Sequence, residues 1–258
     1  MRLEIDVNMQ YMLGDGSMVL LVIEAARTQG QTVLHEQLDI ADATLTRIAG
    51  EGGVGHRLWA QVATEQMNLR YRAEVEITRP QIALESLGPT PIHDLPGDIL
   101  TYLRPSRFCQ SDLFQDFTVQ NFGALEGGRK IVAIRDWIAS EIRYVPASSN
   151  PETTVVDTFA TMEGVCRDYA HLVCALARAA DIPARYASVY GPGVDPQDFH
   201  AVAQVWLEGG WHIVDATGMG SAADLVLIAA GRDAYDIAFM ETRSLAQLVN
   251  QTVDVRRR

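Results

Sequence analysis

Strict alternation of apolar and polar residues dominates the start of the chain and restricts what it can fold into. Apolar side chains occupy the odd positions of residues 3–9 and of residues 67–77. A period of two is typical of strands that bury one face. A continuous apolar run over 18–25 predicts a further, more buried strand. Glycine-containing turn clusters separate these runs, at residues 14–16, 28–30 and 50–53. The pattern predicts an antiparallel β-sandwich over residues 1–80.

Five prolines between residues 80 and 105 interrupt any periodicity. Proline removes a backbone donor and fixes its own φ angle, so neither a regular helix nor a central strand is expected there. We therefore predict an irregular connector over residues 81–105, which follows the strand-rich domain of residues 1–80 and leads into a second domain over residues 106–258.

The second domain reads as a mixture of helices and strands. Apolar residues at helical spacing predict helices over 127–143 and 166–180. Pro183 ends the second of these helices, because proline constrains the residue before it. Short apolar runs predict three strands after it, at residues 184–190, 201–207 and 211–215. For the last 35 residues we expect a loop and short helical pieces, and the fold class of the whole chain is α+β.

Charge and composition exclude several classes of protein. The 258 residues carry a formal net charge of −12, which disfavours binding to nucleic acid and to anionic membranes. Charges in the first seven residues argue against a secretory signal, and no apolar run is long enough to span a membrane, so we expect a cytoplasmic protein. Three cysteines without a paired spacing predict neither a disulfide framework nor a zinc site. The oligomeric state stays open.

Three residues in the second domain could form a thiol-based catalytic site. Cys166 opens an apolar helical run, and His200 and Asp215 follow it in the chain. The first turn of a helix offers free N–H groups and a positive dipole, both of which favour a thiolate. We expect Cys166 to attack an acyl carbon, His200 to move the proton and Asp215 to hold the imidazole in position. The backbone N–H of Cys166 is a natural donor to the oxyanion.

The strand pairing leaves one difficulty for this hypothesis. Glu208-Gly209-Gly210 reads as the turn between the last two predicted strands. A tight turn at Gly209-Gly210 would place Asp215 opposite Gln204 rather than near His200. A bulge, a twist or a longer turn would then be needed to bring Asp215 and His200 together.

Four segments of the second domain resemble the core of the bacterial transglutaminase-like superfamily in order and spacing. They are residues 164–172, 182–186, 199–201 and 211–217. Residues 102–109 and 231–234 also resemble segments of the bacterial branch, so the resemblance extends over most of the chain. It implies a papain-like transglutaminase core preceded by the β-sandwich, with Cys166 as nucleophile, His200 as base and Asp215 as the residue that orients His200.

The resemblance also implies a cysteine protease or amidase that acts on a peptide or protein substrate. Such hydrolysis needs no cofactor, and the scattered histidines predict no metal site. Trp137 and Tyr144 are candidates for a second oxyanion donor or a substrate contact, although core packing is the alternative for both. His171 is expected to be structural.

Two departures from the family pattern bear on the reaction. Members often have an aromatic residue two positions after the histidine and an acid two positions further on, where this chain has Val202 and Gln204. The missing aromatic ring favours hydrolysis over transfer of the acyl group to an amine. Two alternatives remain: protein-glutamine amine transfer, which shares the first half-reaction, and a non-catalytic binding module on the same fold.

Overall fold

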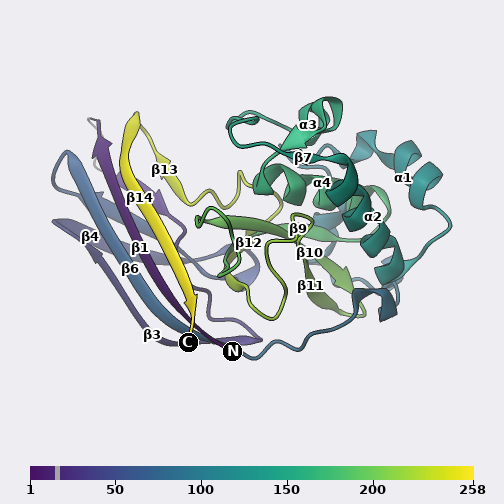
Figure 1. Cartoon of the computed structure of the whole chain (residues 1–258), viewed down its shortest axis with the longest axis horizontal. Coiled ribbons are helices and arrows are strands. Elements are labelled where there is room, and N and C mark those ends of the chain that lie inside the picture. The colour runs from purple at the N-terminus through teal and green to yellow at the C-terminus, as the bar shows by residue number, and fades with distance from the viewer. Residues whose placement is uncertain (15–17) are drawn as a thin grey trace.

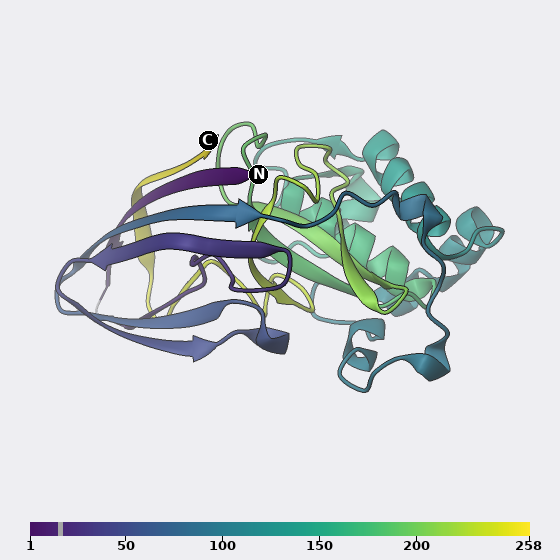
Figure 2. The ribbon, with the colours of Figure 1, turned by 90° about the horizontal axis from the view of Figure 1, so that it is seen from below.

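A computed structural model describes residues 1–14 and 18–258 of the chain. A β-sandwich and a unit of helices on a β-sheet lie side by side, with both termini on the sandwich strands (Figures 1 and 2). The α+β class expected from the sequence is confirmed. Within the described residues, no helix combines the length and the apolar character needed to cross a membrane.

The sandwich consists of two four-stranded antiparallel sheets. One has the order β14-β1-β6-β3 and the other β13-β2-β5-β4. The alternation seen in the sequence explains why the two sheets pack face to face. The odd-numbered, apolar residues of β1 are all buried between the sheets. The strands are β1 (Arg2–Leu13), β2 (Met18–Leu21), β3 (Gln31–Ile40), β4 (Ala43–Ala49), β5 (His56–Val62), β6 (Gln66–Ile77), β13 (Met240–Thr242) and β14 (Ala246–Arg257).

The apolar run at residues 18–25 is a strand only over β2. Its second half is buried but leaves the sheet, because its backbone binds to other parts of the chain. Ala25 N–H donates to the hydroxyl of Tyr71, and Ala26 N–H donates to the carbonyl of Leu227. The first turn predicted from the sequence, at residues 14–16, lies largely outside the described residues.

The last 35 residues differ most from the expectation. The loop and short helical pieces predicted there are wrong: β13 pairs with β2, and β14 runs antiparallel along nearly the whole of β1. Figure 1 shows β14 beside β1. Only Val253 and Val255 of β14 are buried, so this edge strand has too short an alternation to be recognised. The C-terminal residues therefore complete the sandwich instead of belonging to the domain predicted over 106–258.

Within the described residues, the helical unit combines four helices with a four-stranded antiparallel sheet of order β11-β10-β9-β12, and three of the helices pack on the fourth, central one. Its central helix, α4, packs directly on β9 and β10. The elements are α1 (Gln115–Phe122), α2 (Gly127–Glu141), β7 (Arg143–Tyr144), α3 (Val155–Thr161), β8 (Glu163–Gly164), α4 (Cys166–Ala179), β9 (Ala184–Tyr190), β10 (His200–Leu207), β11 (Gly210–Val214) and β12 (Val226–Gly231).

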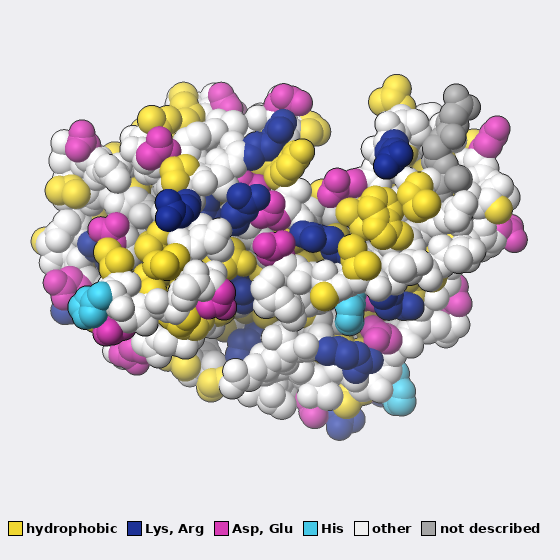
Figure 3. All heavy atoms as spheres, turned by 180° about the vertical axis from the view of Figure 1, so that it is seen from behind, with side chains coloured by type: hydrophobic (Ala, Val, Ile, Leu, Met, Phe, Trp, Pro, Cys, Tyr) yellow, Lys and Arg dark blue, Asp and Glu magenta, His cyan; other side chains and the backbone are white. Residues whose placement is uncertain are grey.

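The segment between the two units contains only short 3-10 turns. They are Leu84–Ser86, Ile92–Asp94, Leu100–Leu103 and Ser111–Leu113, and a fifth turn, Glu51–Gly53, lies in the sandwich. The segment runs along the helical unit (Figure 2). In the space-filling view from behind, a broad notch separates the upper parts of the two units, and acidic and basic side chains are interspersed over the surface (Figure 3).

Candidate active site

Cys166 is the first residue of α4 and is partly exposed, whereas Cys109 and Cys174 are fully buried. Val165 before it has an extended backbone and caps the helix. Asp168, in the first turn, accepts a hydrogen bond of 2.9 Å from Val165 N–H. The thiol therefore lies at the positive end of a 14-residue helix, where backbone N–H groups and the helix dipole favour an anion.

Gly164 fixes how the chain enters this helix. A side-chain Cβ added at Gly164 would lie 2.8 Å from the Cβ of Asp168, closer than real side-chain contacts allow. Gly164 also pairs with Tyr144 in the small parallel sheet of β7 and β8. The absence of a side chain thus lets β8 pass close to the first turn of α4, and the pairing with β7 places Tyr144 near Cys166.

His200 and Asp215 meet at one end of the sheet. His200 is the first residue of β10, and Asp215 follows the last residue of β11. The distance between His200 Nε2 and Asp215 Oδ2 is 2.9 Å. Both side chains are almost completely buried. The structure therefore brings together the two groups whose approach the sequence left in question.

The turn between β10 and β11 explains this approach. Leu207 pairs with Gly210, so the two turn residues are Glu208 and Gly209. Both have positive φ angles, 48° and 78°, as in the type I′ turns that favour tight hairpins. The turn lies one residue earlier than we expected, and each pairing along the ladder shifts with it. No bulge is needed to bring Asp215 close to His200.

The Asp215 carboxylate is held by several donors besides His200. Thr217 donates to Oδ1 through its N–H at 2.9 Å and its hydroxyl at 2.6 Å, and Gly220 N–H donates to Oδ2 at 2.9 Å. Burial acts to raise the pKa of Asp215, but the hydrogen bonds from His200 and Thr217 outweigh it and lower that pKa. Asp215 is therefore an anion with a fixed orientation.

The other ring nitrogen of His200, Nδ1, is buried and has no hydrogen-bond partner among the described residues. Burial tends to lower the pKa of His200, yet the hydrogen bond to Asp215 and the proximity of the Cys166 thiol raise it to about 9. Nε2 is taken by Asp215, so Nδ1 is the nitrogen available to the thiol. The imidazole is thus suited to carry a proton beside a thiolate.

The two candidate oxyanion donors have different neighbours. Burial and the nearby Cys166 raise the pKa of Tyr144 to about 12, so its hydroxyl keeps its proton at neutral pH. Trp137, in α2, instead packs between Phe117 and Phe159, with ring centroids 5.0 Å and 5.8 Å away. The structure brings Tyr144 to Cys166 and places Trp137 in an aromatic cluster.

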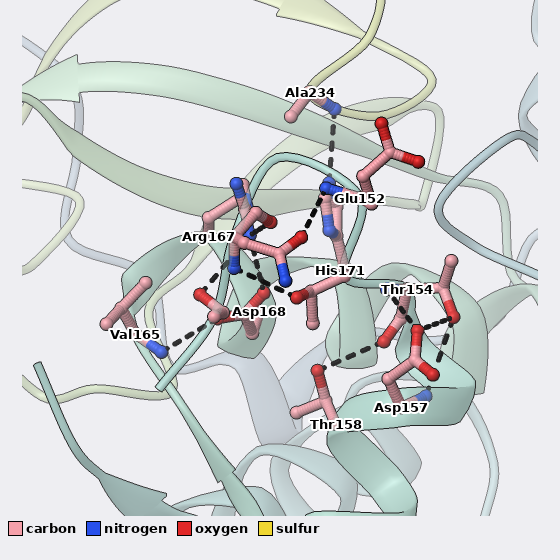
Figure 4. A network of polar contacts seen from close by, with 12 residues as sticks. Glu152, Thr154, Asp157, Thr158, Val165, Arg167, Asp168, His171 and Ala234 are labelled. Atoms are coloured by element: carbon pink, nitrogen blue, oxygen red, sulfur yellow. Dashed lines mark hydrogen bonds and ion pairs between the residues drawn. The ribbon is translucent and has the colours of Figure 1, made fainter. Parts of the chain in front are cut away.

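A polar network surrounds the start of α4 (Figure 4). Arg167 donates to Asn150 O at 2.6 Å and to Ser149 Oγ at 3.2 Å, and lies 3.4 Å from the buried carboxylate of Asp168. These contacts tie the loop after β7 to the residue that follows Cys166. The sequence gives no sign of this link, because the partners are 17 and 18 residues apart.

His171 belongs to the core rather than to the reacting groups. Its Nε2 accepts a hydrogen bond of 3.1 Å from Ala234 N–H, and its ring stacks on Phe108. Burial holds the pKa of His171 well below its ordinary value, with Arg167 and Arg178 acting in the same direction. His171 is therefore neutral, in line with the structural role expected for it.

Sequence reasoning missed two residues that hold Asp215, namely Thr217 and Gly220. An Asp side chain often accepts a hydrogen bond from the backbone N–H two residues later, and Thr is common at that position. The sequence therefore contained a local indication that Thr217 holds Asp215. Gly220 had none. In the described part of the chain, no group of three or more His, Cys, Asp or Glu residues is placed to hold a metal ion.

The chain is similar to known proteins in sequence and, for one solved structure, in fold. The model of the transglutaminase-like superfamily matches residues 117–216, the region from α1 to just beyond Asp215. A solved structure from Cytophaga hutchinsonii, named "Putative Cysteine Protease", is 34% identical, covers 99% of this chain and 90% of its own, and superposes with a TM-score of 0.93.

A second relative is the "Uncharacterized protein ML0607" of Mycobacterium leprae. It is 29% identical over 122 residues, which are 44% of this chain and 43% of the mycobacterial protein. The match thus spans less than half the length of that relative. Because the Cytophaga protein matches over almost the full length of both chains, this chain belongs to the transglutaminase-like superfamily.

Proposed function

We propose that this chain is a thiol-dependent acyl-transfer enzyme that hydrolyses an amide or peptide bond, with Cys166 as nucleophile, His200 as acid and base, and Asp215 as the residue that orients His200. The observation that carries the proposal is the 2.9 Å contact between His200 Nε2 and Asp215 Oδ2, which leaves Nδ1 for the thiol at the start of α4. Family membership and the name of the Cytophaga relative support a thiol enzyme in general.

In the first half-reaction the Cys166 thiolate attacks the carbonyl carbon of the substrate. The carbonyl oxygen becomes an oxyanion, to which the N–H of Cys166 and the hydroxyl of the neighbouring Tyr144 would donate. The imidazolium of His200 gives its Nδ1 proton to the leaving amine as the C–N bond breaks. The products are a free amine and a thioester on Cys166.

The second half-reaction restores the thiol site. A water molecule gives a proton to His200 while its oxygen attacks the thioester carbon, and the C–S bond then breaks. The product is a carboxylic acid, and the thiolate and imidazolium form again. Asp215 keeps the imidazole oriented through both steps and stabilises its positive charge, as the buried carboxylate does in other triads.

Hydrolysis is preferred to amine transfer because of the residue at position 202. Val202 is buried within an apolar cluster, and it takes the place at which members of the family often have an aromatic ring. The thioester then has less protection from water. An amine acceptor would compete with water for the same thioester, which makes amine transfer one of the outcomes of the test.

The test is a set of peptide and amide substrates incubated with the wild type and with Cys166→Ala and Cys174→Ala. We expect turnover and iodoacetamide labelling at neutral pH in the wild type, loss of both in Cys166→Ala, and retention of both in Cys174→Ala, because Cys174 is buried. Labelling confined to Cys109 or Cys174, without turnover, would favour the non-catalytic binding module.

A second arm separates the two reactions. A glutamine-containing acceptor protein is incubated with a fluorescent primary amine and the enzyme, and both amine incorporation and released ammonia or cleaved peptide are measured. Cleavage or ammonia release without incorporation supports hydrolysis. Incorporation as the main product would instead assign the chain to protein-glutamine amine transfer.

A further inference from the structure

A cavity of about 610 Å³ lies between the sheet of the helical unit and the connector. Ala203 and Val205 of β10 pack into the main core, so Gln204 and Trp206 point to the opposite face of the sheet, where the cavity lies. Its size is within the usual range of small-molecule sites. The cavity borders Asp215 but not Cys166, so it is separate from the thiol.

Arg185 lines this cavity and is only 6% exposed. Its Nε donates to Gln204 Oε1 at 2.9 Å, and its guanidinium carbon lies 4.1 Å from the ring centroid of Trp211. Burial lowers the pKa of Arg185 to about 10, although Tyr102 acts in the opposite direction. Arg185 is thus a buried cation at neutral pH that no described carboxylate neutralises.

Arg79, two residues after the end of β6, adds a second positive charge. It lines the same cavity, and its guanidinium donates to Ala222 O at 2.7 Å and to Gln31 Oε1 at 3.0 Å. Burial alone lowers the pKa of Arg79, and no acidic side chain opposes the shift. A buried charge without a counter-charge is unfavourable, so buried Arg185 and partly buried Arg79 beside one cavity favour an anion within it.

Two tryptophans give the cavity a flat apolar wall. Trp206 and Trp211 form an edge-to-face pair with centroids 5.2 Å apart, next to Ile213. The indole N–H of Trp206 is buried and has no hydrogen-bond partner among the described residues. Of the acids in the lining, Asp215 has both oxygens bonded to other groups and Glu85 is exposed.

We propose that this cavity is a binding site for a small organic anion, in which Arg185 binds a carboxylate and the two tryptophans contact a flat apolar group. The planar guanidinium fork matches a carboxylate, and the aromatic walls match the rest of such a ligand. The site is independent of the acyl-transfer reaction, because it uses none of the groups that react.

The test is calorimetric titration of the full chain with benzoate, with its uncharged analogue benzamide and with inorganic phosphate, at constant ionic strength. The protein variants are Arg185→Gln, Arg185→Lys and Cys166→Ala, with Arg135→Gln as the matched control. Arg135 also lines the cavity but is already paired with Asp136, at 2.6 Å. Thermal unfolding of each variant checks that it is folded.

We expect benzoate to bind at least about 10-fold more tightly than benzamide, because a charge-assisted hydrogen bond is lost in the amide. Arg185→Gln should remove this preference, Arg185→Lys should retain part of it, and Arg135→Gln and Cys166→Ala should leave it unchanged. Phosphate should compete with benzoate, because both need the same cation. If Arg185→Gln does not fold, the proposal is still tested by the difference in affinity between benzoate and benzamide in the wild type and in Arg185→Lys.

Equal affinity for benzoate and benzamide in the wild type would overturn the proposal, and so would benzoate binding that survives in folded Arg185→Gln. Loss of binding in Cys166→Ala would place the anion at the thiol instead. A failure of the anion site leaves the proposed hydrolysis untouched, because turnover is measured separately on the same variants.

Discussion

His200 and Asp215 are in contact although they do not face each other across the β10–β11 ladder. The last pair of that ladder joins Ala203 to Val214, so the next residue, Asp215, would stand opposite Val202. Residues two apart in a strand share one face, which makes Asp215 a diagonal neighbour of His200. The diagonal spacing is long for short side chains, but an imidazole and a carboxylate bridge it, and their atoms meet at 2.9 Å.

The first prediction concerns this pair. Asp215→Asn should lower kcat/KM for peptide hydrolysis by about 10³-fold or more, because the amide neither fixes the imidazole tautomer nor stabilises its charge. The control is Asp136→Asn. Asp136 is an exposed residue of α2 that bonds to Arg135, so this substitution should leave kcat/KM unchanged. Steady-state kinetics measure both, and an Asp215→Asn variant within a factor of a few of the wild type would contradict the role of the pair.

The second prediction is the pH dependence of the reaction. The pKa of His200 is raised to about 9, so its proton is present at neutral pH and is lost as the pH rises through that value. Activity should therefore fall on the alkaline side near pH 9. Removing the negative charge in Asp215→Asn lowers the pKa of His200, so the alkaline limb should move to lower pH.

Nuclear magnetic resonance titration of the His200 ring nitrogens checks this assignment independently of turnover. A His200 that titrates near its ordinary value in the wild type would show that the thiol and the carboxylate do not stabilise the imidazolium. An alkaline limb that is the same in the wild type and in Asp215→Asn would assign it to another group.

The central helix α4 and the strands beside it could be predicted because each carries its own local signal, whereas the short elements α3, β7 and β8 were not predicted. The helix from Cys166 has an apolar stripe and a proline after its end, and β9 was expected at the residues it occupies. The contact between His200 and Asp215 could not be settled in the same way. It depends on a one-residue shift of a turn, from Gly209-Gly210 to Glu208-Gly209, and Gly209 suits either version.

The third prediction separates the two candidate oxyanion donors. Tyr144→Phe should lower kcat by about 10²-fold with little change in KM, because a donor to the oxyanion acts mainly in the transition state. Trp137→Phe should leave kcat within about twofold, because that ring packs on Phe117 and Phe159 and a smaller aromatic ring affects stability more than turnover. The reverse ranking in steady-state kinetics would make Trp137 the donor.

The fourth prediction concerns the entry to α4. Gly164→Ala should destabilise the protein by about 1–3 kcal/mol and lower turnover, because the added Cβ would meet the Cβ of Asp168 at 2.8 Å and displace the start of the helix. Gly97→Ala is the control, since a Cβ there has no atom within 4 Å. Denaturant unfolding and kinetics on the two variants measure the effects. Equal stability of both would show that the helix start tolerates a side chain.

The weakest point of the sequence reasoning was the C-terminus, and the reason is physical. An edge strand needs only a few apolar residues, because one of its neighbours is solvent. In β14 the exposed Leu248 and Val249 break the alternation that Val253 and Val255 begin. Its partner β1 lies more than 230 residues earlier in the chain, so nothing local indicates the pairing.

The last prediction tests whether β14 is an integral part of the sandwich. Val255 is 3% exposed and pairs with Ile5, whereas Val249 in the same strand is 51% exposed. Val255→Asp should destabilise the protein by about 3 kcal/mol or more, because an unpaired carboxylate enters the space between the sheets. Val249→Asp should change the free energy of unfolding by at most about 0.5 kcal/mol. Denaturant unfolding measures both, and two variants of equal stability would mean that β14 covers the sandwich without contributing to its core.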